Sequence, residues 1–239
     1  MLCYVDDVLI ATKTIDQHIE RLDEVFGRLK IAGLKCKASK CDFLKTSIKY
    51  LGRIVDEKGL RPDPEMKKAI ETWQIPISKK QVQSFLGFAN YYREFVPHFA
   101  DIASPLNELV KKKVKDPVQL NESQLKAFES LKLALVSPPV LALPKEEGKF
   151  IVDTDASDVA VGVVLSQVQW YEGEWKVRPI GFYSKAMDAA QMRYGTPKQE
   201  MLAVIIALNK FRPFLVHQPF TLRSDHMSFG WLKRWSMQK

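Results

Sequence analysis

The sequence contains little cysteine and no long apolar run, and each absence excludes a class of protein. Three cysteines, Cys3, Cys36 and Cys41, make an odd number, so no disulfide framework is implied and a reducing compartment is expected. The pair Cys36 and Cys41 has no second Cys or His pair nearby at finger spacing, which argues against a zinc site. No apolar run approaches the roughly 18 residues of a membrane-spanning helix, and the first residues lack the pattern of a secretory signal. We therefore expect no membrane partner and a cytoplasmic or nuclear location.

Positive charge is in excess. The 239 residues include 36 Lys and Arg against 28 Asp and Glu, which gives a formal net charge of +8. Such a charge suits a polyanion partner such as nucleic acid, although many basic proteins bind none. The hydrophobic content of 46% is sufficient for a sizeable core, and the length predicts one large or two smaller domains.

Residues 1–144 show mainly the patterns of amphipathic helices. Residues 2–12 are predicted to form two short strands around a turn at Asp6 and Asp7, and "IKYLGRIVDEKGL" is predicted to form a hairpin. Helices are predicted over residues 15–32, at about 64–74, over 79–95, and between Asn121 as N-cap and Pro138 as stop. Pro97 and Pro105 bracket a short piece between the last two helices.

After Pro144 the pattern changes to strands. "KFIVDTDASDVAVGVVLSQ" predicts two strands around a polar break, and "WKVRPIGFYSK" predicts a third. "TPKQEMLAVIIALNKFRPFL" predicts a helix that is apolar nearly all round and therefore buried, and "FTLRSD" predicts a last strand. The fold class expected from about residue 145 is a mixed α+β or α/β domain.

Three carboxylates of this second part are candidates for one site. Asp155 follows an apolar strand, Glu200 lies near the start of the buried helix, and Asp225 ends a later strand. Clustered carboxylates need a counter-charge, and Mg²⁺ prefers their oxygens, so two such ions could support phosphodiester chemistry. Each acid alone also fits a structural role at a turn or helix start. Asp153 and Asp158 compete with Asp155, and spacing does not choose among them.

The adjacent acids Asp6 and Asp7 form a second candidate. They lie at the tip of two apolar segments in "MLCYVDDVLI" and follow an aromatic residue. Two carboxylates there could hold a metal ion, but a solvated turn explains the same residues.

Several motifs in a fixed order add a family resemblance. "YVDD" before "VLIAT" resembles the active-site hairpin of reverse transcriptases, and "YLGRIVDEKGL" resembles their primer grip. "SFLGFANYYREFVPHFADIASPL" resembles the thumb and connection of gypsy-type LTR retrotransposon polymerases. "VDTDASDVAVGVVLSQ", "PIGFYSKAM", "KQEMLAVIIAL" and "FTLRSDHMSF" follow in the order of that family's RNase H domain. The resemblance implies a partial palm at 1–75, helical thumb and connection at 76–144, and an RNase H-like mixed sheet with flanking helices at 145–239.

The resemblance also implies roles for the acids. Asp6 and Asp7 match the metal-binding pair of the polymerase palm. Asp155 in "TDAS", Glu200 in "KQEML" and Asp225 in "SDH" match the RNase H carboxylates, with Mg²⁺ as the cofactor and Mn²⁺ as an alternative. The implied partners are an RNA–DNA hybrid or primer-template and the rest of a Pol polyprotein.

The sequence departs from the family pattern in three places. The first palm aspartate would lie before Met1, the fourth RNase H carboxylate normally follows well after "SDH", and Met227 stands where a basic residue is usual. We therefore expect a slice of a longer Pol polyprotein. Polymerisation by this chain alone is not expected. Hydrolysis of the RNA strand of an RNA–DNA hybrid is the more plausible activity, and the missing fourth acid would weaken one of its metal sites. A catalytically dead or domesticated nucleic-acid-binding remnant is the alternative.

Basic, aromatic and hydroxyl residues are expected to bind the nucleic acid. The candidates are Tyr91, Tyr92, Arg93, Lys111, Lys112, Lys113 and Ser157. Lysine contacts to phosphate would give affinity without sequence preference, and Ser157 would lie near the 2′-hydroxyl that distinguishes RNA from DNA. The tyrosines fit a helical core equally well, and the lysines fit a solvated loop.

Overall fold

The computed structural model describes residues 1–216 and 218–224. The chain divides into two compact units, the first comprising Met1–Asp63 and the second beginning at Pro64. The domain boundaries expected near residues 75 and 144 stay predictions. Among the described residues, no helix is long and apolar enough to cross a membrane.

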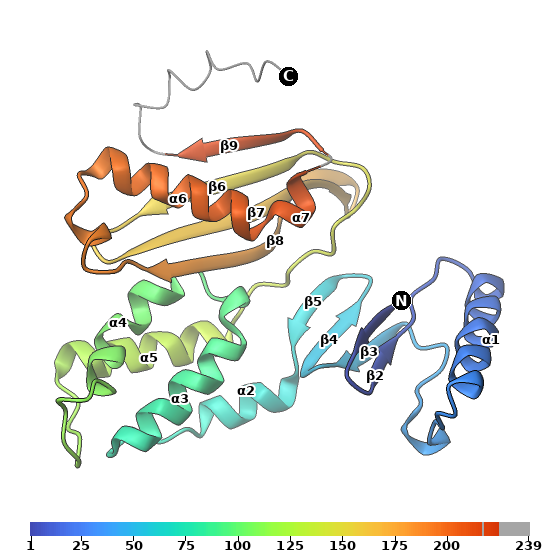
Figure 1. The fold of residues 1–239 in the computed structure, drawn as a ribbon, viewed down its shortest axis with the longest axis horizontal. Helices are drawn as coiled ribbons and strands as arrows, with labels where there is room; N and C mark the ends of the chain where they lie inside the picture. The colour runs from blue at the N-terminus through green and yellow to red at the C-terminus, as the bar shows by residue number, and fades with distance from the viewer. Residues whose placement is uncertain (217, 225–239) are drawn as a thin grey trace. The chain divides into compact units, whose positions relative to one another are not determined.

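The first unit contains two small sheets and one long helix (Figure 1). Strands β1 (Leu2–Tyr4) and β2 (Asp7–Leu9) form a hairpin and are followed by α1 (Ile15–Ile31) and a short 3₁₀ turn, η1 (Ala38–Lys40). Thr14 caps α1 by accepting a hydrogen bond from the backbone N–H of Gln17 at 3.3 Å. Gly33, with φ of 69°, follows the helix.

The predicted primer-grip hairpin is a three-stranded antiparallel sheet instead. It consists of β3 (Ser47–Tyr50), β4 (Arg53–Asp56) and β5 (Gly59–Pro62). Leu51 and Gly52 form the additional tight turn with φ of 47° and 68°. The prediction missed it because such turns strongly favour Asn, Asp or Gly at the first of these positions, and a leucine there gives no turn pattern.

Four helices open the second unit: α2 (Pro64–Glu71), α3 (Lys79–Tyr91), α4 (Phe99–Leu109) and α5 (Glu122–Val136). Asn121 caps α5 in a capping box with Gln124, as its position predicted. Two predictions are wrong in detail. Helix α3 ends at Tyr91 and a 3₁₀ turn, η2 (Arg93–Phe95), follows, and Pro105 lies inside α4. Helix α4 continues past the proline because its apolar face is buried. The helical core comprises Ile70, Val82, Phe85, Leu86, Ala89, Phe95, Leu106, Phe128, Leu131 and Leu135.

The last four described strands form one mixed sheet. They are β6 (Phe150–Ala156), β7 (Ala160–Tyr171), β8 (Glu174–Ala186) and β9 (Phe220–Ser224), in the order β8-β7-β6-β9. Strand β9 pairs parallel to β6, and the other neighbours are antiparallel. This mixed sheet confirms the predicted fold class.

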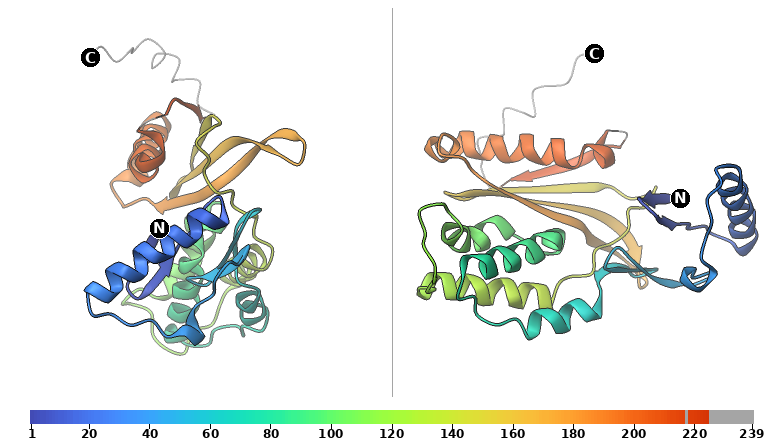
Figure 2. Two further views of the ribbon diagram at one scale, coloured as in Figure 1. Left: turned by 90° about the vertical axis from the view of Figure 1, so that its right-hand side faces the viewer. Right: turned by 60° about the horizontal axis from the view of Figure 1, so that its bottom comes forward.

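Helices flank both faces of the sheet (Figure 2). The 3₁₀ turn η3 (Gln191–Arg193), α6 (Thr196–Lys210) and α7 (Arg212–Leu215) follow β8, and α6 packs on one face through Ala203, Val204 and Ala207. Helices α3, α4 and α5 lie on the opposite side of the sheet, with α4 against β7 and β8. The prediction that α6 is buried nearly all round is wrong, because Ile205 and Leu208 face solvent.

Candidate active site

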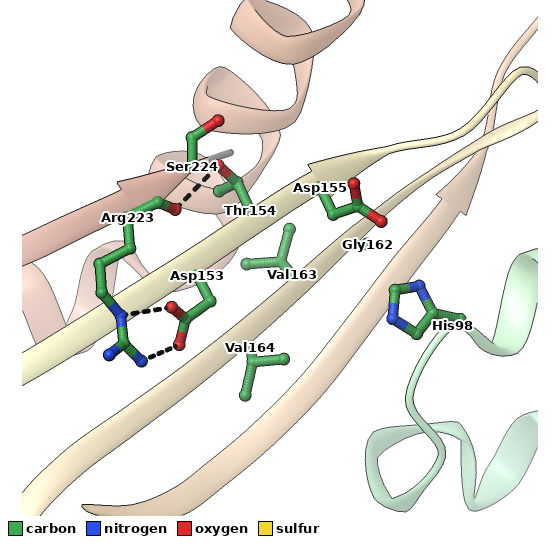
Figure 3. A pocket seen from close by; sticks show the side chains of 9 residues that line it. All are labelled: His98, Asp153, Thr154, Asp155, Gly162, Val163, Val164, Arg223 and Ser224. Carbon is green, nitrogen blue, oxygen red and sulfur yellow. Dashed lines mark hydrogen bonds and ion pairs between the residues drawn. The ribbon is translucent and has the colours of Figure 1, made fainter. Parts of the chain in front are cut away.

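Strand β6 presents its two aspartates on one face of the sheet. Side chains alternate along a strand, so Phe150, Val152 and Thr154 pack on the α6 side. Asp153 and Asp155 point to the other side, where both line a pocket of about 290 Å³ (Figure 3). The alternation therefore separates the core residues of β6 from its acids.

Asp153 and Arg223 form a bidentate ion pair across β6 and β9. The parallel register places the two residues opposite each other. The Nε and Nη2 atoms of Arg223 donate to the two carboxylate oxygens of Asp153 at 2.6 and 2.8 Å. The Asp153 carboxylate raises the pKa of the Arg223 guanidinium. Because Asp153 is paired, Asp155 is the pocket acid with no hydrogen bond or ion pair among the described residues.

Glu200 lies at the same end of the sheet as Asp155, on the α6 side. Its side chain is only 5% exposed and accepts a hydrogen bond from the hydroxyl of Ser224 at 3.2 Å. Ser224 is the last residue of β9 and pairs with Thr154, the residue directly before Asp155. Asp225 follows Ser224 but lies outside the described residues, as does Met227.

Within the described part of the chain, no group of three or more His, Cys, Asp or Glu side chains has the arrangement of a metal site. Asp225, the third predicted RNase H carboxylate, is not among these residues. The two described acids, Asp155 and Glu200, thus lie at the same end of the sheet without forming a complete ligand set by themselves.

Two pocket residues were missed at the sequence level. His98 begins α4 in a left-handed conformation, with φ of 51°, and lines the pocket together with Asp155. Arg223 reaches the pocket because β9 pairs in parallel with β6. No pattern in the sequence predicts the strand register that brings Arg223 to the pocket. His98 lies some 55 residues before the acids in the sequence, so no local pattern connects it with them.

Ser157 and Asp158 occupy the turn after β6. The hydroxyl of Ser157 accepts hydrogen bonds from the backbone N–H groups of Val159 and Ala160 and donates to the carboxylate of Asp101 on α4. Asp158 is exposed in the same turn. Ser157 therefore has a clear structural role in joining this turn to α4.

The aromatic and basic candidates at 91–93 divide into one exposed residue and two internal ones. Tyr91 is 49% exposed, whereas Tyr92 is 6% exposed. The two rings contact each other edge-on, with 4.9 Å between their centroids. Arg93 is half-buried and donates hydrogen bonds to the Asn90 side chain and to the carbonyl oxygen of Ser184.

The lysine cluster forms the exposed connection between α4 and α5. Lys111 pairs with Glu108 at 2.6 Å, an arrangement in which both side chains remain mostly exposed. Lys112 and Lys113 are exposed, and no described residue pairs with them.

Asp6 and Asp7 lie on the small hairpin of the first unit. Tyr4 pairs with Asp7, so Val5 and Asp6 form a two-residue turn. Val5 has φ of 54°, a conformation that strains a β-branched residue. Both carboxylates are exposed. The two strands around a turn agree with the prediction, but the turn lies one residue earlier, at Val5 and Asp6, and Asp7 is the first residue of β2.

Two family models match separate segments of the chain. Residues 1–55 match the family described as reverse transcriptase (RNA-dependent DNA polymerase). Residues 120–222 match the RNase H-like domain found in reverse transcriptase. The chain thus carries a reverse transcriptase segment followed by an RNase H-like domain, two families of enzymes that generally depend on divalent metal ions.

The chain is similar in sequence to transposon Pol polyproteins. It is 38% identical over 231 residues to the retrovirus-related Pol polyprotein from transposon 297 of Drosophila melanogaster, covering 97% of this chain and 21% of that protein. It is also 38% identical over 228 residues to the transposon Tf2-3 polyprotein of Schizosaccharomyces pombe, covering 95% of this chain and 17% of that protein. The chain therefore spans about a fifth of the length of these relatives.

Solved structures show the same fold. The foamy viral protease-reverse transcriptase in complex with an RNA/DNA hybrid superposes with a TM-score of 0.80 at 24% identity, over 98% of this chain and 31% of that one. The same kind of protein in complex with double-stranded DNA gives a TM-score of 0.79 at 24% identity, over 99% of this chain and 41% of that one.

Proposed function

We propose that the RNase H-like part of this chain hydrolyses the RNA strand of an RNA–DNA hybrid, with Asp155, Glu200 and Asp225 as the carboxylates that hold Mg²⁺ or Mn²⁺. The observation that carries the proposal is the position of Glu200. A carboxylate that is 5% exposed lies beside the end of β9, which pairs with the segment just before Asp155.

The donor set fits a hard divalent cation. Asp155 and Glu200 offer carboxylate oxygens, the ligands that Mg²⁺ prefers together with water and phosphate. Bound divalent ions would activate the attacking water and stabilise the leaving 3′ oxygen. In this proposal Asp155 and Glu200 hold the ions in place. The Ser224 hydroxyl orients the Glu200 carboxylate, and Arg223 keeps Asp153 neutralised.

The nucleic acid would be held by exposed basic and aromatic groups. Tyr91, Lys112 and Lys113 are exposed and suited to stacking and to phosphate contact. The foamy viral structures with hybrid and double-stranded DNA support a nucleic-acid partner. Arg93 and Tyr92 act inside the protein in this proposal, because their contacts are internal.

The hairpin acids Asp6 and Asp7 are proposed to hold metal ions for RNA-directed DNA synthesis within a longer Pol polyprotein. Their exposed position at a strand–turn–strand tip supports this role. The chain covers a fifth of its relatives, so synthesis is assigned to the polyprotein as a whole. Three free cysteines fit a reducing cytoplasmic or nuclear setting for it.

The test is cleavage of an RNA strand, labelled at its 5′ end, in an RNA–DNA hybrid by the complete chain with Mg²⁺ or Mn²⁺. Asp155→Asn and Glu200→Gln are each expected to reduce the rate at least about a hundredfold, the scale of losing one catalytic group. Asp153→Asn is the matched control on the same strand and face. It should keep most of the activity, because Arg223 already engages that carboxylate.

Equal loss in Asp153→Asn and Asp155→Asn would contradict the assignment of Asp155. A folded chain that binds the hybrid without cleaving it would favour the alternative, a nucleic-acid-binding remnant.

A further inference from the structure

A row of three paired residues crosses the sheet at Asp155. Asp155 on β6 pairs with Gly162 on β7, and Gly162 pairs with Ser184 on β8. The row therefore connects the proposed metal-binding acid with the sheet edge that packs against the helices.

One short segment, Arg93–Asp101, contacts this row and the turn after it. Arg93 donates to the carbonyl oxygen of Ser184, and the backbone N–H of Ala100 donates to the Ser184 hydroxyl at 2.8 Å. Asp101 accepts a hydrogen bond from Ser157, two residues after Asp155. These contacts fix the start of α4 relative to Asp155.

His98 lies in the middle of this segment, and its ring rests over Gly162. A Cβ atom added at Gly162 would lie 3.0 Å from Nδ1 and 3.2 Å from Cε1 of the ring. Glycine at this position thus makes room for the imidazole. The left-handed backbone of His98, in which histidine is enriched, directs the ring toward the pocket.

The ring is available to a ligand. His98 is exposed, and no hydrogen bond or ion pair to its ring exists among the described residues. It lines the same pocket as Asp155 and Arg223 (Figure 3). A neutral imidazole carries one N–H donor in either tautomer, and the guanidinium adds further donors. The ring N–H can therefore donate a hydrogen bond to an anionic group such as a phosphate in this pocket.

We propose that His98 is a substrate-binding residue that donates a hydrogen bond to a backbone phosphate of the hybrid strand passing Asp155. This assignment rests on the proposed function for the location of the strand. It makes the thumb and connection helices part of the RNase H-like site, since His98 is the N-cap residue of α4. Gly162 serves as a positioning residue that keeps the ring in place.

The test measures hybrid binding by the complete chain in Ca²⁺, using fluorescence anisotropy, with melting temperatures recorded in parallel. His98→Ala is expected to weaken binding about tenfold, the scale of one hydrogen bond to a charged group. His98→Asn keeps an N–H donor and should recover part of the affinity. Gly162→Ala should weaken binding because the added methyl displaces the ring.

The double variant Gly162→Ala with His98→Ala completes a cycle. It should bind no more weakly than His98→Ala alone, because the ring that the methyl displaces is already gone. Unchanged binding by His98→Ala at an unchanged melting temperature would overturn the proposal. A double variant that loses as much affinity as the two single variants together would overturn it as well.

Cleavage with Mg²⁺ separates this proposal from the proposed function. If the native chain binds the hybrid without cleaving it, the hydrolytic function fails, and the binding cycle still decides the role of His98. If the native chain cleaves and His98→Ala leaves binding and KM unchanged, the role of His98 fails while the hydrolytic function stands.

Discussion

Arg93 donates a hydrogen bond to the main-chain carbonyl oxygen of Ser184, a residue 91 positions further along the chain. The same guanidinium lies over the rings of Phe99 and Tyr183, at 5.4 and 5.3 Å from their centroids. Arg93 thus joins the helical part of the second unit to the sheet through a hydrogen bond and two cation–π contacts.

Replacement of Arg93 by Ala is expected to destabilise the second unit by about 2–4 kcal/mol. It removes the hydrogen bond and the two cation–π contacts, and it leaves a part-buried carbonyl without its donor. Arg93→Lys should recover only part of this loss, because an ammonium lacks the planar fork. Urea unfolding followed by tryptophan fluorescence measures the change. Arg193→Ala, at an exposed position, is the control and should stay within about 0.5 kcal/mol. An Arg93→Ala effect of that small size would show that the joint contributes little.

Gly148 and Gly87 should respond oppositely to alanine. Gly148 has φ of 105°, and a Cβ atom there would lie 2.1 Å from the carbonyl oxygen of Val168. Main-chain atoms cannot yield cheaply, so Gly148→Ala should destabilise by more than about 1 kcal/mol. Gly87 lies in α3 with nothing within 4 Å of the added atom, so Gly87→Ala should stabilise by about 0.5–1 kcal/mol. Thermal unfolding of the two variants tests the contrast, and a shift in the same direction for both would refute it.

The three-stranded sheet of the first unit should lose stability in acid. Burial raises the pKa of Asp56, but the Arg61 guanidinium at 2.5 Å and the N–H groups of Lys58 and Gly59 outweigh it and lower the pKa below 3.8. A carboxyl whose pKa is lower in the folded state than in the unfolded state stabilises the fold. This stabilisation is complete at pH values above the unfolded-state pKa, and it is lost as the pH falls through the folded-state pKa. We expect this contribution to be lost below about pH 4, and its size to be about 1 kcal/mol, the scale of one ion pair.

Hydrogen exchange of residues 47–62 between pH 6 and pH 3, expressed as protection factors, measures this effect. The Asp56→Asn variant has no carboxyl group at this position, so its protection factors should depend less steeply on pH. An equally steep dependence in that variant would assign the acid sensitivity to other groups.

The Lys112 and Lys113 pair should contribute salt-dependent, sequence-independent affinity for nucleic acid. The binding constant K falls with salt, so the slope of log K against log salt concentration is negative. If both side chains contact phosphates, replacing them by Ala makes this slope less negative by roughly 1–2, at about 0.9 per contact. Lys126→Ala, an exposed lysine on α5, is the matched control. Titrations at several salt concentrations supply the slopes. An unchanged slope in the double variant would identify the lysines as a solvated loop.

Local sequence patterns predicted the elements well and their long-range pairing poorly. Thr14 and Asn121 cap helices with their own neighbours, so the first turns of α1 and α5 depend on nearby residues. Gly33 likewise marks a helix end by its own backbone freedom. The turn at Leu51 was missed because its residue type is unusual there. Short-range chemistry was thus a good guide wherever the residue type matched the conformation.

The candidate site was only partly predictable for a physical reason. Asp155 and Glu200 carry family motifs, and the structure places them at one end of the sheet. The pairing of Asp153 with Arg223 depends on strand register, and the approach of His98 depends on the packing of α4 against β7. Neither relationship leaves a periodic trace in the sequence, because each joins distant segments.

The parallel pairing of β9 with β6 has a consequence for the order of folding. Antiparallel β6, β7 and β8 close through short turns, whereas Asp153 and Arg223 are 70 positions apart. Closing a longer loop costs more chain entropy, so long-range pairing forms late. A chain emerging from the ribosome would therefore complete the three-stranded meander first and dock β9 last. The acid pair of β6 would be assembled before Arg223 arrives, which makes the neutralisation of Asp153 one of the final events of folding.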